Sequence, residues 1–162
     1  MPKDAAPEVM PELAAASIFD LTGKVGLVTG GGTGIGKMIT AAFIRNGAKI
    51  YIASRKKADL DKQAAALSKL SPSGAIQGGD AACIALEADV STKAGCDALA
   101  KQIIEKESKL DILVNNAGLT WGAPMDDFPE AKGWDKTFAM NVKSQFYLTV
   151  ACVKAVVSQW QW

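Results

Sequence analysis

The sequence predicts an α/β protein with a doubly wound parallel sheet, in which helices cover both faces. Two observations predict this class. Short apolar runs typical of buried parallel strands alternate four times with segments of helical spacing. Turns rich in glycine or asparagine follow the first and fourth runs, and in such sheets ligands bind beyond the carboxyl ends of the strands. We expect right-handed crossovers between the strands.

The elements of the first half are predicted from apolar runs and from the residues that end them. Residues 24–29 and 48–54 are short apolar runs expected as strands, and residues 56–70 form an Ala- and Leu-rich stretch expected as a helix. The helix between the two strands should end at Asn46-Gly47, because glycine readily takes the left-handed conformation after a helix. Its apolar residues recur at helical spacing: Ile35, Ile39, Ala42 and Phe43.

The third and fourth strands are expected at residues 82–88 and 110–114. A loop with one proline and three glycines, residues 71–80, precedes the third strand. Ser91 is expected to cap the helix between these strands, since a serine side chain can accept a bond from a free helical N–H. That helix carries an apolar stripe of Cys96, Leu99, Ile103 and Ile104.

A long helix is expected over residues 133–157, after an irregular loop at residues 121–129 that holds two prolines. Apolar residues near one face of this helix indicate the side that packs. They are Phe138, Val142, Phe146, Val150 and Val153, with Thr149 among them.

Composition excludes several classes of function. The chain has 162 residues, a net charge of +1 and no histidine, so Ser-His-Asp and Cys-His catalysis and His-ligated zinc are excluded. Near-neutral charge argues against nucleic acid or an anionic membrane as the main partner. The three cysteines are far apart and are expected to be buried, reduced thiols rather than disulfides or metal ligands.

The two ends of the chain are expected to lie outside the domain. Residues 1–17 contain three prolines and three acidic residues, so we expect a flexible arm rather than a targeting signal, and a cytoplasmic protein. Residues 158–162 hold two of the four tryptophans and are expected to be an aberrant tail, read through from an intron. A genuine short terminus is the alternative.

A glycine-rich turn follows the first strand and opens the first helix. It reads T-G-x-x-x-G-I-G through Gly30, Thr33, Gly34, Ile35 and Gly36. Glycine leaves no Cβ between backbone and ligand, and the free N–H groups of the helix suit a pyrophosphate. The strict G-x-G-x-x-G and P-loop patterns are absent. The alternative is a glycine-rich hinge.

This glycine motif resembles that of the short-chain dehydrogenase/reductase family, and three further motifs follow in the family's order. The resemblance covers residues 19–157. It implies that Asp89 and Val90 contact the adenine, that Asn115-Asn116-Ala117-Gly118 is the family's N-N-A-G signature at the cofactor, and that Asn141 is the active-site asparagine. Each motif has a simpler reading: a residue at a helix start, turn formers, or a polar residue of a helix.

The resemblance also implies a Rossmann-type fold with strand order 3-2-1-4, of which residues 18–157 form the N-terminal part only. By the same resemblance, the substrate is a small carbonyl or alcohol and the complete protein forms a homo-oligomer. No nucleic acid, membrane or metal is expected.

The residues after the second strand favour NADP(H) over NAD(H). NAD(H) is typically held by an acidic side chain there, which bonds the ribose 2′-hydroxyl. Here that place has Ser54, followed by Arg55, and arginine can grip a 2′-phosphate through two parallel hydrogen bonds. Alternatively, Arg55 and Lys56 are only solvated residues at a helix start.

The family's catalytic serine and Tyr-x-x-x-Lys are missing from this chain. Four residues after Tyr51 is Arg55, and four residues after Tyr147 is Ala151. We therefore expect a member of an NADP(H)-dependent oxidoreductase family whose 162 residues have negligible turnover alone. The alternative is a non-catalytic product that binds a nucleotide or interferes with dimers. A Rossmann-type methyltransferase is opposed by the glycine spacing and by N-N-A-G.

Overall fold

The four strands form one parallel sheet with the order β3-β2-β1-β4. The computed structural model describes residues 15–73, 76 and 82–157. The strands are β1 (Val25–Thr29), β2 (Lys49–Ser54), β3 (Cys83–Glu87) and β4 (Ile112–Val114). In the register, Val28 of β1 lies beside Ile52 on one side and Val114 on the other. The predicted α/β class and strand order 3-2-1-4 are confirmed.

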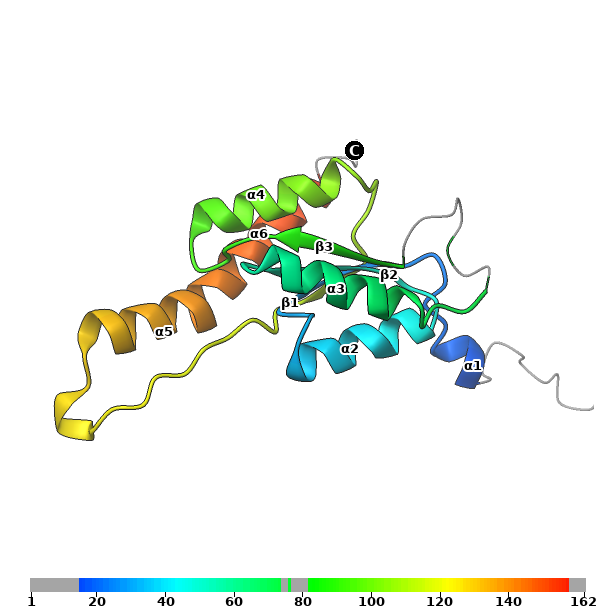
Figure 1. Cartoon of the computed structure of the whole chain (residues 1–162). Helices are drawn as coiled ribbons and strands as arrows, with labels where there is room; N and C mark the ends of the chain where they lie inside the picture. Colours follow the sequence, from blue (N-terminus) through cyan, green and yellow to red (C-terminus); the bar gives the residue numbers. More distant parts are fainter. Residues whose placement is uncertain (1–14, 74–75, 77–81, 158–162) are drawn as a thin grey trace, which may run out of the picture.

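Helices cover the two faces in pairs (Figure 1). The helices α2 (Gly34–Arg45) and α3 (Lys57–Ser68) pack on one face, and α4 (Lys93–Ile104) and α6 (Ser144–Val157) on the other. The period of two in the strands decides which residues face which pair. Leu27 and Tyr51 enter the core with α4 and α6, whereas Val28 and Ile52 enter the core with α2 and α3.

The first helix of the sheet ends as the sequence predicts. Asn46 follows α2, and Gly47 has a φ of 94°, the left-handed conformation that favours glycine. Ile35, counted among the apolar positions, is 67% exposed, because the buried side of α2 is made by Gly36, Thr40 and Ile44. The predicted helix is therefore confirmed, but Ile35 does not pack into the core.

The cap of α4 is Thr92 and not Ser91, so that prediction is wrong. The Ser91 hydroxyl and N–H both donate to Oδ1 of Asp89, at 2.7 and 3.0 Å. With Ser91 held in this turn, the next residue takes the extended cap conformation. The Thr92 hydroxyl then accepts from the N–H of Gly95 at 3.0 Å.

The long helix begins earlier than predicted and is not a uniform α-helix. After a short 3₁₀ helix η3 (Met125–Asp127), it runs through η4 (Glu130–Asp135), α5 (Lys136–Phe138) and η5 (Ala139–Lys143) into α6. The segments η4 and η5 are π-helical. This part projects away from the sheet in Figure 1.

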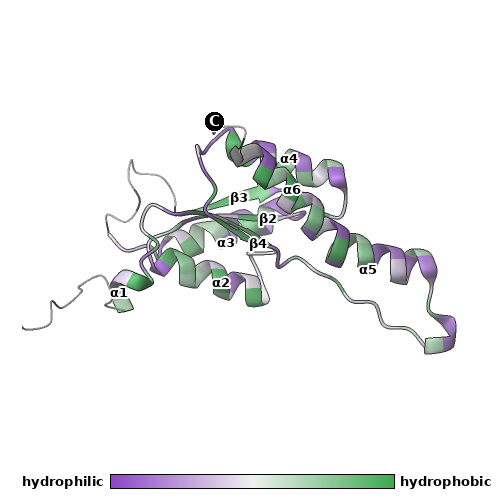
Figure 2. Cartoon of the chain, turned by 180° about the vertical axis from the view of Figure 1, so that it is seen from behind, coloured by the Kyte–Doolittle hydropathy of each residue, from purple (hydrophilic) through white to green (hydrophobic). Residues whose placement is uncertain are grey.

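The apolar face predicted for the long helix is not its buried face. Four of the predicted residues are 47–65% exposed: Phe138, Val142, Phe146 and Val153. The buried side is made by Met140, Ser144, Leu148 and Cys152, which face α4 and the sheet. Figure 2 shows hydrophobic residues on the helix where it leaves the sheet.

Part of the predicted arm, residues 1–14, and the predicted tail, residues 158–162, lie outside the described residues, as does most of the predicted loop at residues 71–80. The helix α1 (Ala15–Ile18) precedes the first strand. Within the part of the chain that the structure describes, no helix is long and apolar enough to cross a membrane.

Candidate functional site

The glycine turn joins the end of β1 to the start of α2 at the carboxyl edge of the sheet. Gly30 and Gly34 have φ values of 66° and 51°, which side chains rarely adopt. The N–H groups of Gly34, Ile35 and Gly36 have no acceptor among the described residues, and the Thr33 side chain makes no capping bond. A twelve-residue helix therefore directs three free donors outward, as an anion requires.

Gly36 is a point of close contact between two stretches of backbone. A Cβ at this position would lie far inside contact distance of the carbonyl of Gly30 and of the Asn116 side chain. The first turn of α2 is therefore pressed against the end of β1, with no room for a side chain. This is the close approach that brings helical N–H groups next to a bound phosphate.

Thr29 and Asn116 connect the end of β1 to the segment after β4. The buried Thr29 hydroxyl accepts the N–H groups of Asn116 and Ala117, at 3.0 and 2.9 Å, and donates to the carbonyl of Val114 at 3.3 Å. The Asn116 amide donates to the carbonyl of Thr29 at 2.9 Å. The glycine turn and the N-N-A-G segment thus form one unit, although they lie 86 residues apart.

Asp89 and Arg55 stand beyond the ends of β3 and β2. Hydrogen bonds from the hydroxyl and N–H of Ser91 lower the pKa of Asp89, and the charge of Arg55 lowers it further. The Ser54 hydroxyl accepts the N–H of Lys56 at 3.4 Å, and Val90 is buried, its carbonyl contacted by the Cys96 thiol at 3.3 Å. The positive charge of Arg55 therefore favours the ionised carboxylate of Asp89 at this end of the sheet.

Asn141 lies in the π-helical segment η5, facing the segment after β4. Its amide donates to the carbonyl of Leu119 at 2.8 Å, and its Oδ1 accepts the N–H of Leu119 at 2.9 Å. Gly118 lies beside it, where a Cβ would be 3.3 Å from Oδ1 of Asn141. The Asn141 amide thus pairs with both backbone groups of Leu119, and the role implied for Asn141 in catalysis stays a prediction.

The structure gathers the predicted site residues along one edge of the sheet. Their order follows that of the strands: Asp89 and Val90 after β3, Ser54 and Arg55 after β2, the glycine turn after β1, and Asn115 to Gly118 after β4. Their individual roles toward a cofactor stay predictions.

Two further residues shape this edge without having been singled out. Thr29 carries the bonds described above, although the sequence shows it only as the last residue of a strand. Gly95 lies in the first turn of α4, where a Cβ would overlap the carbonyl of Asp89. An isolated glycine inside a helical pattern was the available signal for Gly95.

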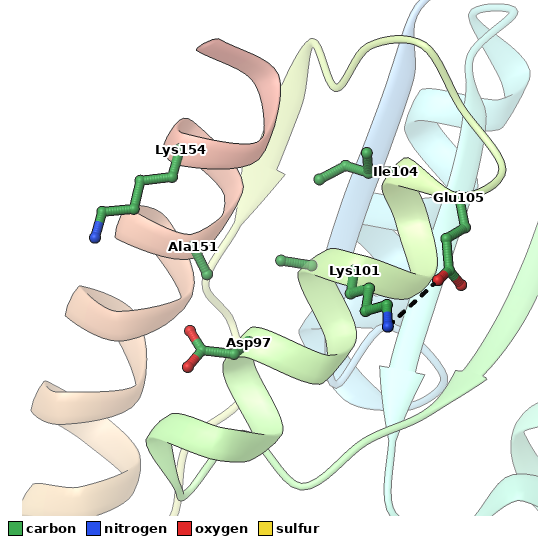
Figure 3. A pocket seen from close by; sticks show the side chains of 7 residues that line it. Asp97, Lys101, Ile104, Glu105, Ala151 and Lys154 are labelled. Atoms are coloured by element: carbon green, nitrogen blue, oxygen red, sulfur yellow. Dashed lines mark ion pairs between the residues drawn. The ribbon is translucent and has the colours of Figure 1, made fainter. Parts of the chain in front are cut away.

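A groove of about 410 Å³ lies elsewhere, between α4 and α6 (Figure 3). Its lining includes Asp97, Lys101, Glu105 and Lys154, with the Lys101–Glu105 ion pair at 3.8 Å. It extends toward the carboxyl ends of these helices. In a parallel α/β sheet this is the end opposite the loops that bind ligands, so the groove is separate from the candidate site.

The three cysteines are free and buried, as the sequence predicts. Burial raises the pKa of Cys83 to about 12 and that of Cys152 to about 11. Both stay protonated near neutral pH and are poor nucleophiles. Neither lies in the candidate site.

Known proteins are similar to this chain in sequence and in fold. The family model described as short chain dehydrogenase matches residues 24–161. The rhamnolipids biosynthesis 3-oxoacyl-[acyl-carrier-protein] reductase of Pseudomonas aeruginosa is 41% identical over 128 residues, which cover 79% of this chain and 46% of that protein.

Two solved structures have the same arrangement of elements. The Pseudomonas aeruginosa RhlG/NADP active-site complex has a TM-score of 0.72 at 38% identity, covering 86% of this chain and 48% of that one. The L-sorbose reductase of Gluconobacter frateurii, complexed with NADPH and L-sorbose, has a TM-score of 0.74 at 25% identity, covering 87% and 50%. The chain spans about half the length of these relatives. The match of the family model over most of the chain shows that the chain belongs to the short-chain dehydrogenase/reductase family.

Proposed function

We propose that this chain is the NADP(H)-binding part of an oxidoreductase that transfers hydride between NADP(H) and a small carbonyl or alcohol. The nucleotide-binding unit is residues 18–157. One observation carries the proposal: three unpaired N–H groups at the start of α2 lie in a glycine cradle, on the sheet edge that also holds Arg55. Family membership supplies the reaction class.

Each end of the cofactor would meet a different group of residues. The N–H groups of Gly34, Ile35 and Gly36 would hold the pyrophosphate, and Asp89 with Val90 would border the adenine. Asn115 to Gly118 would lie under the nicotinamide half, because β4 is next to β1 on the side away from β2 and β3. Bound NADPH supplies the hydride for such a reduction.

Preference for the phosphorylated cofactor rests on Arg55. A guanidinium beyond β2 stabilises the 2′-phosphate through charge-assisted hydrogen bonds. No acidic side chain stands at residues 54–56 to bond a free ribose 2′-hydroxyl or to repel a phosphate. Two of the relatives described above were solved with NADP or NADPH, which supports the same preference.

A substitution at Arg55 tests the cofactor preference. In Arg55→Ala, we expect the Kd for NADPH to rise roughly tenfold to a hundredfold, as for a lost bond to a charged group, with little change for NADH. Lys69→Ala removes the same charge at the far end of α3 and is the matched control. Equal losses for both cofactors, or no loss for NADPH, would contradict the assignment.

We also propose that this polypeptide alone has negligible turnover. The family's proton donor and its lysine are absent from the sequence, and a general acid typically contributes about 10²–10⁴-fold to a rate. Mixing the chain with NADPH and a panel of aldehydes and ketones should show no loss of NADPH beyond that of Gly36→Ala. Turnover abolished by Gly36→Ala would contradict this and assign catalysis to residues present here.

A second candidate is a binding subunit that associates with longer relatives through its helix. The exposed apolar residues of the long helix favour it, since Phe138, Val142 and Phe146 are 47–65% exposed. Co-expression with a full-length relative, followed by size-exclusion chromatography, distinguishes the two candidates. A mixed dimer favours the second, and separate elution favours the first.

A further inference from the structure

The segment after β4 is fastened to the long helix at both of its ends. At one end, the Asn115 amide donates to the Thr149 hydroxyl at 3.2 Å. At the other end, Asn141 exchanges two hydrogen bonds with the backbone of Leu119. The earlier residue of the segment meets the later residue of the helix, so the two pieces of chain run antiparallel.

The lengths of the two pieces agree with this double attachment. Eight residues of helix separate Asn141 from Thr149, which is about 12 Å at 1.5 Å per residue. Four residues separate Asn115 from Leu119, which can span at most about 14 Å of extended chain. The segment is therefore long enough to reach both points of attachment on the helix.

The Thr149 hydroxyl acts toward Asn115 as a hydrogen-bond acceptor and not as a donor. Its hydroxyl proton is used inside the helix, because it donates to the carbonyl of Gln145 at 2.7 Å. This bond orients the side chain and leaves the oxygen lone pairs for the Asn115 amide. A valine at this position keeps the shape and loses both bonds, whereas a serine keeps both.

Between the two attachments, the segment faces the glycine turn. The N–H groups of Asn116 and Ala117 are held by Thr29, and the Asn116 side chain reaches the carbonyls of Thr29 and Gly30. The segment therefore lies between the end of β1 and the helix, and its position depends on both.

We propose that Thr149 is a positioning residue for cofactor binding: through Asn115, it holds the segment of residues 115–119 where the nicotinamide half of the cofactor lies. This inference rests on the proposed function for its consequence, although the attachment itself is independent of any ligand. Thr149 touches neither cofactor nor substrate in this account and acts through Asn115 and the backbone that follows.

The attachment is tested first without ligand, by amide hydrogen exchange on the full 162-residue chain. In Thr149→Val, we expect the N–H of Leu119 to exchange roughly twofold to tenfold faster, as for one lost hydrogen bond, while β1 to β3 keep their protection. Thr149→Ser should exchange like the wild type. Thr137→Val is the matched control, because the buried Thr137 hydroxyl of α5 has no partner among the described residues.

The consequence for binding is tested with two ligands. NADPH spans the whole site, whereas 2′,5′-ADP occupies only the adenosine end. We expect Thr149→Val to raise the Kd for NADPH about twofold to tenfold and to leave that for 2′,5′-ADP unchanged, with Thr149→Ser restoring NADPH binding.

The outcomes separate this inference from the proposed function. Unchanged exchange at residues 115–119 overturns the positioning role, whatever the cofactor results. Faster exchange with equal losses for both ligands also overturns it, because the effect would then not be confined to the nicotinamide half. If the wild type binds neither ligand, the proposed function fails, and hydrogen exchange alone decides whether Thr149 fixes the segment.

Discussion

The sheet has two unlike parts. We call β1, β2 and β3 with their helices the closed side, and β4 with the exposed face of α6 the open side. On the closed side, every residue of β1 is buried, and Ile50 to Ala53 of β2 are buried as well. On the open side, all three residues of β4 are only half-buried, and Phe146 of α6 is 65% exposed. The residues on both sides are apolar, but only those of the closed side are fully buried. Burial of a residue in this chain therefore depends on which elements pack against it and not on its hydrophobicity alone.

The closed side is well buried because helices cover both of its faces, although β3, like β4, pairs with only one strand of the described sheet. β1 lies between β2 and β4, and α2 and α3 cover one face, as α4 and α6 cover the other. β4 pairs only with β1 in the described sheet, so its other edge is unpaired there. The cofactor residues from Gly30 to Asp89 lie on the closed side, which is why we expect nucleotide binding from this chain.

The largest loss should come from breaking the link between the two sides. Thr29→Val leaves the N–H groups of Asn116 and Ala117 without their acceptor in a buried site, which should cost about 2–4 kcal/mol of unfolding free energy. Chemical denaturation of the variant measures this cost. Thr29→Ser keeps the hydroxyl and should lose much less, and an equal loss in both variants would count against the hydrogen bonds as the cause.

A side chain in the glycine cradle should damage the phosphate site directly. In Gly36→Ala, the added methyl overlaps the carbonyl of Gly30, so overpacking should cost about 1–3 kcal/mol and displace the donors that would hold the pyrophosphate. We expect NADPH affinity to fall roughly a hundredfold in calorimetric titration. Gly122→Ala, which meets no atom within 4 Å, should change neither quantity. Unchanged binding in Gly36→Ala would rule out the cradle as the phosphate site.

Acid should lower the stability of the chain at the start of β4, where Asp111 lies. Burial would raise the pKa of Asp111, but the N–H of Val25 at 2.8 Å and the nearby Lys109 and Lys24 outweigh it and lower the pKa. The stability that this lowered pKa contributes is fully present above the unfolded value of about 3.9. It is lost as pH falls through the lower pKa of the folded protein.

The variant Asp111→Asn isolates this contribution. It should lose about 1–2 kcal/mol of stability at pH 7, because its amide cannot replace the charge-assisted bonds. Wild type and variant should converge as pH falls from about 3.9 through the lowered pKa of the folded carboxyl, because the native side chain is protonated only below that pKa. Thermal unfolding across pH measures both curves, and a difference that does not shrink as pH falls below about 3.9 would show that shape rather than charge is responsible.

The smallest stability effect should come from the exposed helix face, together with a clear change in solubility. Phe146→Gln removes an apolar side chain that is 65% exposed, so unfolding free energy should change by less than about 0.5 kcal/mol. If this apolar face drives self-association, light scattering at high protein concentration should be lower for the variant than for the wild type. Unchanged scattering would indicate that the helix face does not drive self-association.

Sequence reasoning succeeded where the signal is local. The strand, glycine turn and helix over residues 24–47 were predicted because an apolar run, glycines of positive φ and an Asn-Gly stop act within a few residues of each other. The identity of the cap of α4 was missed because Ser91 and Thr92 can both cap a helix, and serine is the more common cap. Only the Asp89 turn, which binds Ser91, decides between them.

Long-range relations were predictable only through the family resemblance or not at all. The pattern of the long helix correctly showed an apolar face at Phe138 and Phe146, but that face is exposed because the described residues place nothing against it. The bond between Asn115 and Thr149 depends on the segment and the helix meeting in antiparallel directions. No spacing in the sequence indicates that meeting.

We expect the closed side of this 162-residue chain to bind NADP(H) without any further residues. Calorimetric titration of the full 162-residue chain with NADPH, 2′,5′-ADP and NADH tests it most directly. We predict that NADPH binds at least about tenfold more tightly than NADH, and that 2′,5′-ADP retains most of the NADPH affinity because Arg55 and the glycine turn lie on the closed side. Equal or tighter binding of NADH, or no binding of any of the three by a folded chain, would contradict the account.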